Sequence, residues 1–209
     1  MIKVLIADDH TIVRHGLKQI LDSDNDIHVA GEAQNGNEVL GFVRDNRVDV
    51  VVMDITMPGR NGLETLKELR RGWPDVPVVI LSMHPQDQYA VRVLRAGASG
   101  YVTKESAPDE LVAAIKRAHN GQKYISPDVA ELLAFHIQKG NSDDPHKQLS
   151  DREFEVFVMI GHGKSLTEIA EELFISVKTV STYRARILEK TGLPNNAAIT
   201  KYCMQHGLA

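Results

Sequence analysis

The sequence predicts an α/β protein in which a doubly wound parallel sheet precedes a small all-α domain. Between residues 1 and 122, short apolar runs alternate with helical patterns five times, which is typical of parallel strands joined by right-handed crossovers. Residues 149–209 contain helix-start signals and no strand signal. The length of 209 residues favours two domains.

The first domain is expected to be a (βα)5 unit. Val50–Met53 is the clearest strand, because every side chain in this run is apolar and such a run suits a strand covered on both faces. The strands are expected near residues 2–7, 28–33, 48–54, 76–82 and 99–103, and the helices near 12–21, 36–46, 62–71, 86–96 and 107–119. Periodicity does not give the order of the strands in the sheet.

Residues 123–148 are expected to form a helical linker and a flexible connector. Ser126 before Pro127 has the form of an N-cap with proline at the first helical position, and a short apolar pattern follows from Val129 to Ile137. Lys139–Pro145 has no apolar residue to bury, so we expect it to be solvated.

Four helices are expected in residues 149–209. Ser150 and Ser165 each open a capping box with a glutamate three residues later, and Ser176 can cap the third helix. The four helices are expected to end near Gly161, Leu173, Thr191 and Gln205. Gly192 supplies the stop of the third helix. The tight turn before Ser176 makes the second and third helices a helix-turn-helix, with the third as the recognition helix.

Composition and charge narrow the possible functions. No apolar run is long enough to cross a bilayer and the first residues predict a strand, so we expect a cytoplasmic protein. Cys203 is the single cysteine, and its apolar neighbours suit a buried structural thiol. Basic and acidic residues number 14 and 17 over residues 1–122, 3 and 4 over 123–148, and 7 and 7 over 149–209. A nucleic-acid partner would therefore need positive charge gathered on one face.

Acidic side chains follow two strands of the predicted sheet. Asp8 and Asp9 end the first strand, and Asp54 ends the third. Neighbouring strands lie about 5 Å apart, so these carboxylates are expected to converge, and a hard cation would offset their repulsion. A cluster of oxygen ligands alone, without histidine or cysteine, favours Mg²⁺ over zinc.

Ser82 and Lys104 are expected at the same edge of the sheet, which completes a phosphoryl-acceptor site in outline. Asp54 can be the nucleophile, Mg²⁺ and Lys104 can offset charge on the transferring oxygens, and Ser82 can hydrogen-bond the product. Each residue also has a structural alternative: Asp8 and Asp9 as N-caps, Asp54 and Ser82 as turn residues, and Lys104 as a solvated charge. Their occurrence at successive strand ends favours the functional interpretation.

Residues 1–120 resemble the receiver domain of two-component response regulators. The matching residues are Asp8-Asp9, Asp54, Thr56-Met57-Pro58-Gly59, Ser82, Tyr101 and Lys104. The resemblance implies a flavodoxin-like sheet of order 2-1-3-4-5 and phosphorylation of Asp54 by a sensor histidine kinase. It also implies that Asp9, Asp54 and the Thr56 carbonyl hold Mg²⁺ with Asp8 one layer further out, and that Ser82 and Tyr101 move together as a switch.

One position departs from the receiver pattern. Many receivers have proline after the lysine, in a cis peptide, whereas Glu105 follows Lys104 here. A cis bond to a residue other than proline is costly, so the isomer of this peptide stays open.

The expected recognition helix has two distinct faces. Val177, Val180, Ile187 and Leu188 recur at helical spacing and should face the core, and the opposite stripe contains Lys178, Ser181, Thr182 and Ala185. Four basic residues against Glu189 give the helix a local charge of +3. Basic flanks around small and hydroxylic side chains suit the major groove of DNA, although a solvated amphipathic helix is the alternative.

The C-terminal domain resembles the LuxR-type helix-turn-helix. The matching segments are Leu149–Glu153, Glu168–Ala170 and Ser176–Tyr183. The whole chain is thus similar to the NarL/FixJ-like subfamily of response regulators. The resemblance implies that Ser181, Thr182 and Ala185 face bases and that Lys178 and Thr179 lie near phosphates. Arg186, one of the basic residues of this helix, is also expected to contact DNA. Because this stripe lacks a bidentate Arg or Asn, we expect some reliance on DNA shape.

We therefore expect a DNA-binding transcriptional regulator, switched by phosphorylation, rather than an enzyme that turns over a substrate. The phosphorylated form is expected to be a homodimer that reads two half-sites about one helical turn apart, and RNA polymerase is a candidate partner. One alternative is an Mg²⁺-dependent phosphatase with Asp54 as nucleophile, but Thr56 stands where such hydrolases place a second acid. The other is a helical domain that binds RNA or protein, which the single aromatic residue of the helix, Tyr183, supports poorly.

Overall fold

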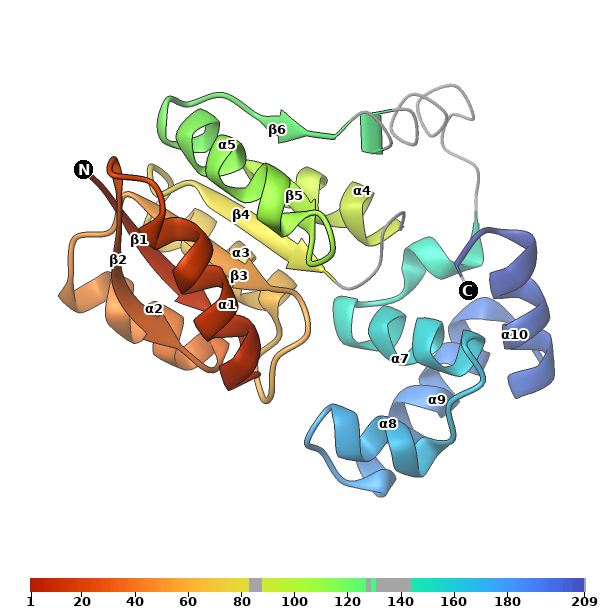
Figure 1. The fold of residues 1–209 in the computed structure, drawn as a ribbon. Coiled ribbons are helices and arrows are strands. Elements are labelled where there is room, and N and C mark those ends of the chain that lie inside the picture. The colour runs from red at the N-terminus through yellow and green to blue at the C-terminus, as the bar shows by residue number, and fades with distance from the viewer. Residues whose placement is uncertain (83–87, 127–128, 131–143, 209) are drawn as a thin grey trace. The chain divides into compact units, whose positions relative to one another are not determined.

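The computed structural model of the chain describes residues 1–82, 88–126, 129–130 and 144–208 (Figure 1). The chain divides into two compact units, Met1–Phe135 and His136–Ala209. Val129 and Ala130, in the helix expected between Ser126 and Ile137, are helical. The other residues of that helix after Ser126, and most of the expected connector 139–145, lie outside the described residues. The domain boundaries at residues 122 and 148 therefore stay a prediction.

The first unit is built on one parallel sheet. Its strands are β1 (Ile2–Ala7), β2 (Ile27–Ala33), β3 (Val50–Asp54), β4 (Val78–Ser82), β5 (Gly100–Thr103) and β6 (Tyr124–Ile125). Their order is β2-β1-β3-β4-β5-β6, and every neighbouring pair is parallel. The expected (βα)5 fold and the implied order 2-1-3-4-5 are thus confirmed. The sixth strand, β6, was not expected. It has only two residues, which is too short to produce a periodic pattern in the sequence.

Helices cover both faces of the sheet. They are α1 (Thr11–Asp22), α2 (Gly36–Asp45), α3 (Gly62–Gly72), α4 (Gln88–Arg95) and α5 (Ala107–His119). Helices α1 and α5 pack together on one face, and α2 and α3 pack together on the other (Figure 1). Every residue of β3 is buried, as expected for a central strand. Because burial of one aliphatic side chain stabilises the fold by about 1.5–3 kcal/mol, this strand is a rigid support for the residue at its end.

The second unit is entirely helical in its described residues. It contains the 3₁₀ helix η1 (Pro145–Gln148) and the α-helices α7 (Asp151–Gly161), α8 (Leu166–Glu172), α9 (Val177–Thr191) and α10 (Asn196–Gln205). The two capping boxes opened by Ser150 and Ser165 are confirmed, as is the cap supplied by Ser176. Gly192 ends α9 with a φ of 70°, a left-handed conformation that glycine adopts at little cost.

Both ends of the segment 123–148, the expected linker and connector together, belong to folded elements. Tyr124 pairs with Gly100 of β5 in the first unit. His146 is fully buried in the second unit, where its Nδ1 lies 2.8 Å from the Tyr202 hydroxyl. Cys203 is buried as predicted, and burial raises the pKa of its thiol to about 12.

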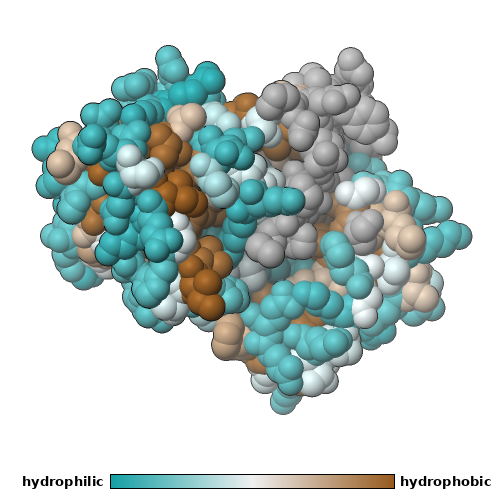
Figure 2. All heavy atoms as spheres, viewed as in Figure 1, coloured by the Kyte–Doolittle hydropathy of each residue, from teal (hydrophilic) through white to brown (hydrophobic). Residues whose placement is uncertain are grey.

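The surface is mainly hydrophilic, with hydrophobic patches on the face that Figure 2 shows. The large apolar side chains exposed among the described residues are Met1, Ile12, Phe174, Val177 and Met204. None of the helices in the described residues combines the length and the hydropathy that a bilayer span requires.

Candidate functional site

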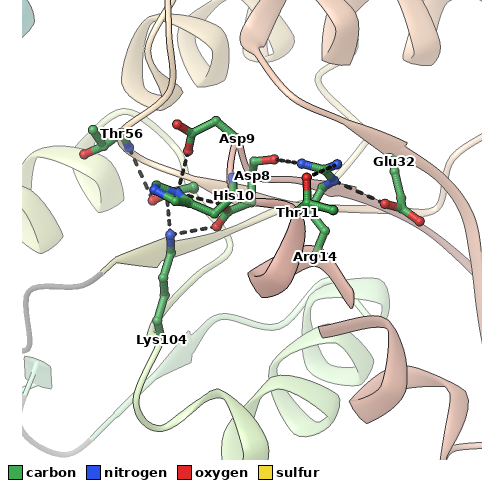
Figure 3. A network of polar contacts seen from close by, with 9 residues as sticks. Asp8, Asp9, His10, Thr11, Arg14, Glu32, Thr56 and Lys104 are labelled. Atoms are coloured by element: carbon green, nitrogen blue, oxygen red, sulfur yellow. Dashed lines mark hydrogen bonds and ion pairs between the residues drawn. The ribbon is translucent and has the colours of Figure 1, made fainter. Parts of the chain in front are cut away.

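Acidic side chains converge at the carboxyl edge of the sheet, as predicted. Ala7 of β1 pairs with Met53 of β3, so the residues that follow them, Asp8 and Asp54, stand at the same level. One ligand atom from each of Asp8, Asp9, His10 and Asp54 lies within 4.8 Å of all the others (Figure 3). The register of two adjacent strands therefore brings together carboxylates that are far apart in the sequence.

Lys104 is inserted between two of these acids. Its Nζ lies 2.7 Å from Asp8 Oδ2 and 2.6 Å from Asp54 Oδ2 (Figure 3). The backbone supports this position, because the Lys104 N–H donates to the Ser82 carbonyl at 2.7 Å. Lys104 is thus a buried counter-charge of the acidic cluster, and the alternative of a solvated charge is wrong.

The electrostatics of Asp54 result from burial and from two charged neighbours. Asp54 is only 3% exposed. Burial raises the pKa of its carboxyl group, Lys104 lowers it and Asp8 raises it, which gives a pKa of about 6. Burial alone would lower the pKa of Lys104, but its contacts with Asp54 and Asp8 outweigh that effect and raise it. The Asp54 carboxylate is therefore ionised at neutral pH, as a nucleophile must be.

His10 corrects one expectation about this cluster. The ligand set was expected to lack histidine, but the His10 Nδ1 lies 2.9 Å from Asp9 Oδ1 and 3.4 Å from Asp8 Oδ1. His10 occupies the N-cap position of α1, which directs its ring back toward the acids, and 68% of its side chain is exposed. Its place directly after Asp9 in the sequence was the signal that could have revealed it.

Asp8 and Asp9 do not act as N-caps of the first helix, which was the structural alternative for these two residues. Helix α1 has no side-chain hydrogen bond at its N-cap, so neither Asp8 nor Asp9 caps it. Instead, Asp8 Oδ1 accepts a hydrogen bond from the His10 N–H at 2.8 Å.

The donor set fits a hard divalent cation. Asp8, Asp9 and Asp54 carry three carboxylates against the single ammonium of Lys104, which leaves negative charge that a cation such as Mg²⁺ would offset. Thr56, an expected ligand through its carbonyl, is adjacent, because its N–H donates to Asp54 Oδ1 at 3.3 Å. Oxygen donors dominate even with His10 present, so the preference for Mg²⁺ stands.

The segment after β3 passes close to Asp54. The Gly62 N–H donates to the Ile55 carbonyl at 2.8 Å. A Cβ atom at Gly62 would stand 2.3 Å from the Asp54 carbonyl oxygen, closer than real Cβ atoms come to any neighbour. Gly62 is therefore required for helix α3 to begin directly against the end of β3.

Ser82 and Tyr101 occupy the expected positions in the sheet. Ser82 ends β4, is fully buried and pairs with Thr103 of β5, and Tyr101 is buried within β5. Residues 83–87, which follow Ser82, lie outside the described part of the chain. The Lys104–Glu105 peptide is trans, since the described residues contain no cis peptide bond. The joint movement of Ser82 and Tyr101 stays a prediction.

Helix α9 presents most of its expected face. Val180 and Ile187 are buried and Leu188 is half-buried, whereas Ser181 and Ala185 are exposed. Val177 was expected in the core but is 43% exposed. It is the first residue of α9, one turn before the part of the helix that packs on the unit, and periodicity alone does not show where packing begins.

A depression of about 330 Å³ lies beside α9. It is lined by Ser176, Lys178, Thr179, Thr182, Tyr183 and Arg186. Four of these residues were predicted to contact DNA. Ser176 and Tyr183 were not, although Ser176 was identified as the cap of this helix.

The basic residues of α9 divide into two pairs. Arg184 donates to Asn196 Oδ1 at 2.6 Å, and Lys190 Nζ lies 2.6 Å from Glu153 Oε2, so both are engaged within the unit. In the part of the chain that the structure describes, neither Lys178 nor Arg186 forms an ion pair, and both line the depression. The predicted DNA contacts of these two residues stay a prediction.

A receiver-type acidic site followed by a helix-turn-helix defines the class of response regulators, and comparison with known proteins agrees. Residues 4–116 match the response regulator receiver domain, and residues 147–203 match the bacterial regulatory proteins of the luxR family. The chain belongs to the response regulator family, with a receiver domain and a LuxR-type DNA-binding domain. The expected function, a DNA-binding transcriptional regulator of a two-component system, is thus confirmed.

Named relatives are similar along the whole chain. The response regulator UvrY of Escherichia coli K12 is 39% identical over 209 residues, covering all of this chain and 96% of UvrY. The response regulator GacA of Pseudomonas aeruginosa is also 39% identical over 209 residues, covering all of this chain and 98% of GacA. The family consists of regulators rather than classical enzymes, and a receiver domain implies a histidine kinase as its partner.

Solved structures show the same fold. RcsB of Salmonella enterica serovar Typhimurium, bound to the promoter P1flhDC in the presence of the phosphomimetic BeF₃⁻, is 30% identical with a TM-score of 0.62, covering 96% of this chain and 97% of RcsB. ChrA, from a heme-sensing two-component system, is 34% identical with a TM-score of 0.55, covering all of this chain and 98% of ChrA. A further RcsB structure contains two dimers on two parallel DNAs.

Proposed function

We propose that Asp54 accepts a phosphoryl group from a sensor histidine kinase and that this modification controls DNA binding by the second unit. The observation that carries the proposal is the state of Asp54 itself. Its carboxylate is almost fully buried and yet ionised at neutral pH, because Lys104 is 2.6 Å away. A buried anion that is held beside a cation at the edge of a parallel sheet is suited to attack phosphorus.

The transfer moves one phosphoryl group between two nucleophiles. An oxygen of Asp54 forms the new bond to phosphorus, and the bond from phosphorus to the kinase histidine nitrogen breaks, with the electron pair staying on that nitrogen. Lys104 pairs with Asp54 Oδ2 and is within reach of the transferred oxygens. A bound Mg²⁺ would offset charge on those oxygens, with Asp9, Asp54 and the Thr56 carbonyl as its ligands and Asp8 one layer further out.

The modified residue changes the charge next to two buried groups. Before transfer, Lys104 neutralises part of the charge of Asp54 and Asp8. Afterwards the phosphoryl oxygens compete for Lys104 and offer new acceptors to the Ser82 hydroxyl, and Tyr101 of the neighbouring strand repositions with Ser82. If the receiver surface has two conformations, the added charge shifts the equilibrium between them, and this shift is sufficient for a switch.

The second unit binds duplex DNA, and α9 is its recognition helix. Lys178, Thr179 and Arg186 contact phosphates, and Ser181, Thr182 and Ala185 face bases. The exposed face of the helix and the unpaired cations beside the depression support this assignment, and the RcsB complexes with DNA and as dimers agree with it. A phosphorylated homodimer would read two half-sites. We also propose a cytoplasmic location, where such a protein meets its DNA.

A pair of matched variants tests this function. Asp54→Asn removes the nucleophile with little change in shape, and Asp45→Asn makes the same change at an exposed position. After incubation with acetyl phosphate and Mg²⁺, we expect wild type and Asp45→Asn to be phosphorylated and to bind promoter DNA more tightly, in a salt-dependent manner. Modification of Asp54→Asn, or unchanged DNA affinity after modification, would show that the switch is misassigned.

A further inference from the structure

Arg14 contacts the loop that contains Asp8 and Asp9, two of the three acids of the site. The loop Asp8–His10 joins β1 to α1, and the Arg14 side chain holds its first residue. Arg14 Nη1 donates to the Asp8 carbonyl at 2.7 Å (Figure 3). The other end of the loop is held by the first backbone hydrogen bond of α1, from the Arg14 N–H to the His10 carbonyl at 3.1 Å, which does not depend on the side chain at position 14. Asp9 lies between these two carbonyls.

The guanidinium of Arg14 is itself fixed from several sides. The residue is 6% exposed. Its Nε donates to Glu32 Oε2 at 3.2 Å, and its Nη2 lies 3.4 Å from Thr11 Oγ1. Glu32 comes from β2, where it pairs with Ile6 of β1. The Arg14 side chain therefore connects β2, the end of β1 and the start of α1.

The other polar groups of Asp8 contact other residues, and its backbone carbonyl is the group that contacts Arg14. The Asp8 N–H donates to the Ala33 carbonyl at 3.1 Å, Oδ1 accepts from the His10 N–H, and Oδ2 pairs with Lys104. With the carbonyl bonded to Arg14, the N–H, the carbonyl and Oδ1 of Asp8 are hydrogen-bonded, and Oδ2 has the ion pair with Lys104. The orientation of this residue, and of the peptide that leads to Asp9, is thus determined.

We propose that Arg14 is a positioning residue of the acidic site, which holds the Asp8–His10 loop in the geometry that binds the divalent cation. This inference rests on the proposed Mg²⁺ site. Arg14 contacts no reacting atom and acts through the Asp8 carbonyl. A purely structural ion pair between α1 and β2 would stabilise the fold and leave metal affinity unchanged, whereas a positioning residue sets metal affinity even where stability is preserved. Mutation of a residue that supports a metal ligand commonly lowers the affinity for the metal by about 10-fold to 100-fold.

The experiment measures Mg²⁺ binding by calorimetry on the full chain, without a phosphodonor. Arg14→Met removes the bond to Asp8 and leaves Glu32 paired only with Lys18, whose Nζ lies 3.9 Å from Glu32 Oε1. The double variant Arg14→Met/Glu32→Gln removes both charges of a pair whose glutamate is exposed, so we expect little loss of stability from the pair itself. Arg14→Lys keeps the charge but replaces the separate Nε, Nη1 and Nη2 donors by one ammonium nitrogen, which is not shaped to bond Asp8 and Glu32 together. Arg44→Met, which removes an exposed arginine paired with Asp45, is the matched control.

We expect the Kd for Mg²⁺ to rise about 10-fold or more for Arg14→Met and for the double variant. Arg14→Lys should lie between them and wild type, and Arg44→Met should equal wild type. Urea unfolding should show the double variant and Arg14→Lys close to wild type in stability. With acetyl phosphate as donor, the Mg²⁺ concentration for half-maximal rate should rise in the same order, with a smaller change in rate at saturating Mg²⁺.

Three results would overturn these assignments in distinguishable ways. Wild-type Mg²⁺ affinity in folded Arg14→Lys and in the double variant would make Arg14 structural only. A loss of affinity that follows the loss of stability from variant to variant would do the same. Absence of Mg²⁺ binding by wild type itself would end the proposed metal site, and the role of Arg14 with it.

Discussion

Lys104 Nζ and Asp54 Oδ2 are 2.6 Å apart, although 50 positions separate the two residues in the sequence. The contact exists because β3 and β5 both flank β4 in the sheet and their carboxyl ends share one edge. It keeps a buried carboxylate ionised and places a cation where charge would develop during phosphoryl transfer.

Replacing Lys104 should separate its role in transfer from its role in folding. For Lys104→Met we predict that the rate of phosphorylation by acetyl phosphate falls about 100-fold, because a charge that stabilises the transferring oxygens is lost. Lys3→Met, at an exposed position of β1, is the control and should keep the wild-type rate. A rate within a factor of two of wild type for Lys104→Met would remove Lys104 from the reaction.

Gly62 and Gly41 should respond in opposite directions to the same substitution. In Gly62→Ala the new methyl group meets the Asp54 carbonyl oxygen and the Ile55 Cα, so we predict a loss of about 1–3 kcal/mol in the free energy of unfolding. Gly41 lies within α2 with nothing near its Cβ position, and Gly41→Ala should stabilise by about 0.5–1 kcal/mol. Urea unfolding followed by Trp73, the single tryptophan and the C-cap of α3, reports on this unit. Equal effects of the two changes would refute the close approach.

Glu153 should make the second unit sensitive to acid. Burial alone would raise the pKa of its carboxyl group, but hydrogen bonds from Lys190 and Ser150 outweigh burial and lower it. A pKa that is lower in the folded state stabilises above the unfolded value, about 4.3 for glutamate, and this contribution is lost as the pH falls through the folded value.

We therefore predict that Glu153→Gln lowers stability at pH 7 by about 1–3 kcal/mol and reduces the further loss between pH 5 and pH 3. Circular dichroism follows the helices of both units, whereas Trp73 reports on the first unit alone, so the part of the transition that Trp73 does not follow belongs to the second unit. An unchanged slope of stability against pH in Glu153→Gln would show that another group carries the acid sensitivity.

The two pairs of cations on α9 should differ in their effect on DNA binding. Lys178→Met and Arg186→Met should each weaken binding to all sequences alike and reduce the slope of log affinity against log salt by about one. Lys190→Met removes the same charge, but Lys190 is engaged with Glu153, so this variant should lower stability and leave the salt slope unchanged. Titrations of labelled promoter DNA at several salt concentrations measure both quantities. Equal slopes for all three variants would contradict the assignment.

Local signals were sufficient for much of the fold. A few neighbouring residues are enough to recognise the apolar run of β3, the capping serines of the second unit and the acids at the strand ends. The structure places all of these as predicted. His10 was missed although it directly follows Asp9 in the sequence, because this adjacency was not used and the direction of the ring, back to Asp9, is visible only in the structure. The bond from Arg14 to Asp8 and its pair with Glu32 depend on strand register, which periodicity does not contain.

The most direct test of the account identifies the modified residue itself. Wild-type protein is incubated with acetyl phosphate and Mg²⁺, the acyl phosphate is reduced with borohydride, and the resulting homoserine is located by peptide mass spectrometry. The account predicts homoserine at position 54 and nowhere else. Homoserine at another aspartate, or full phosphorylation without conversion of Asp54, would contradict it.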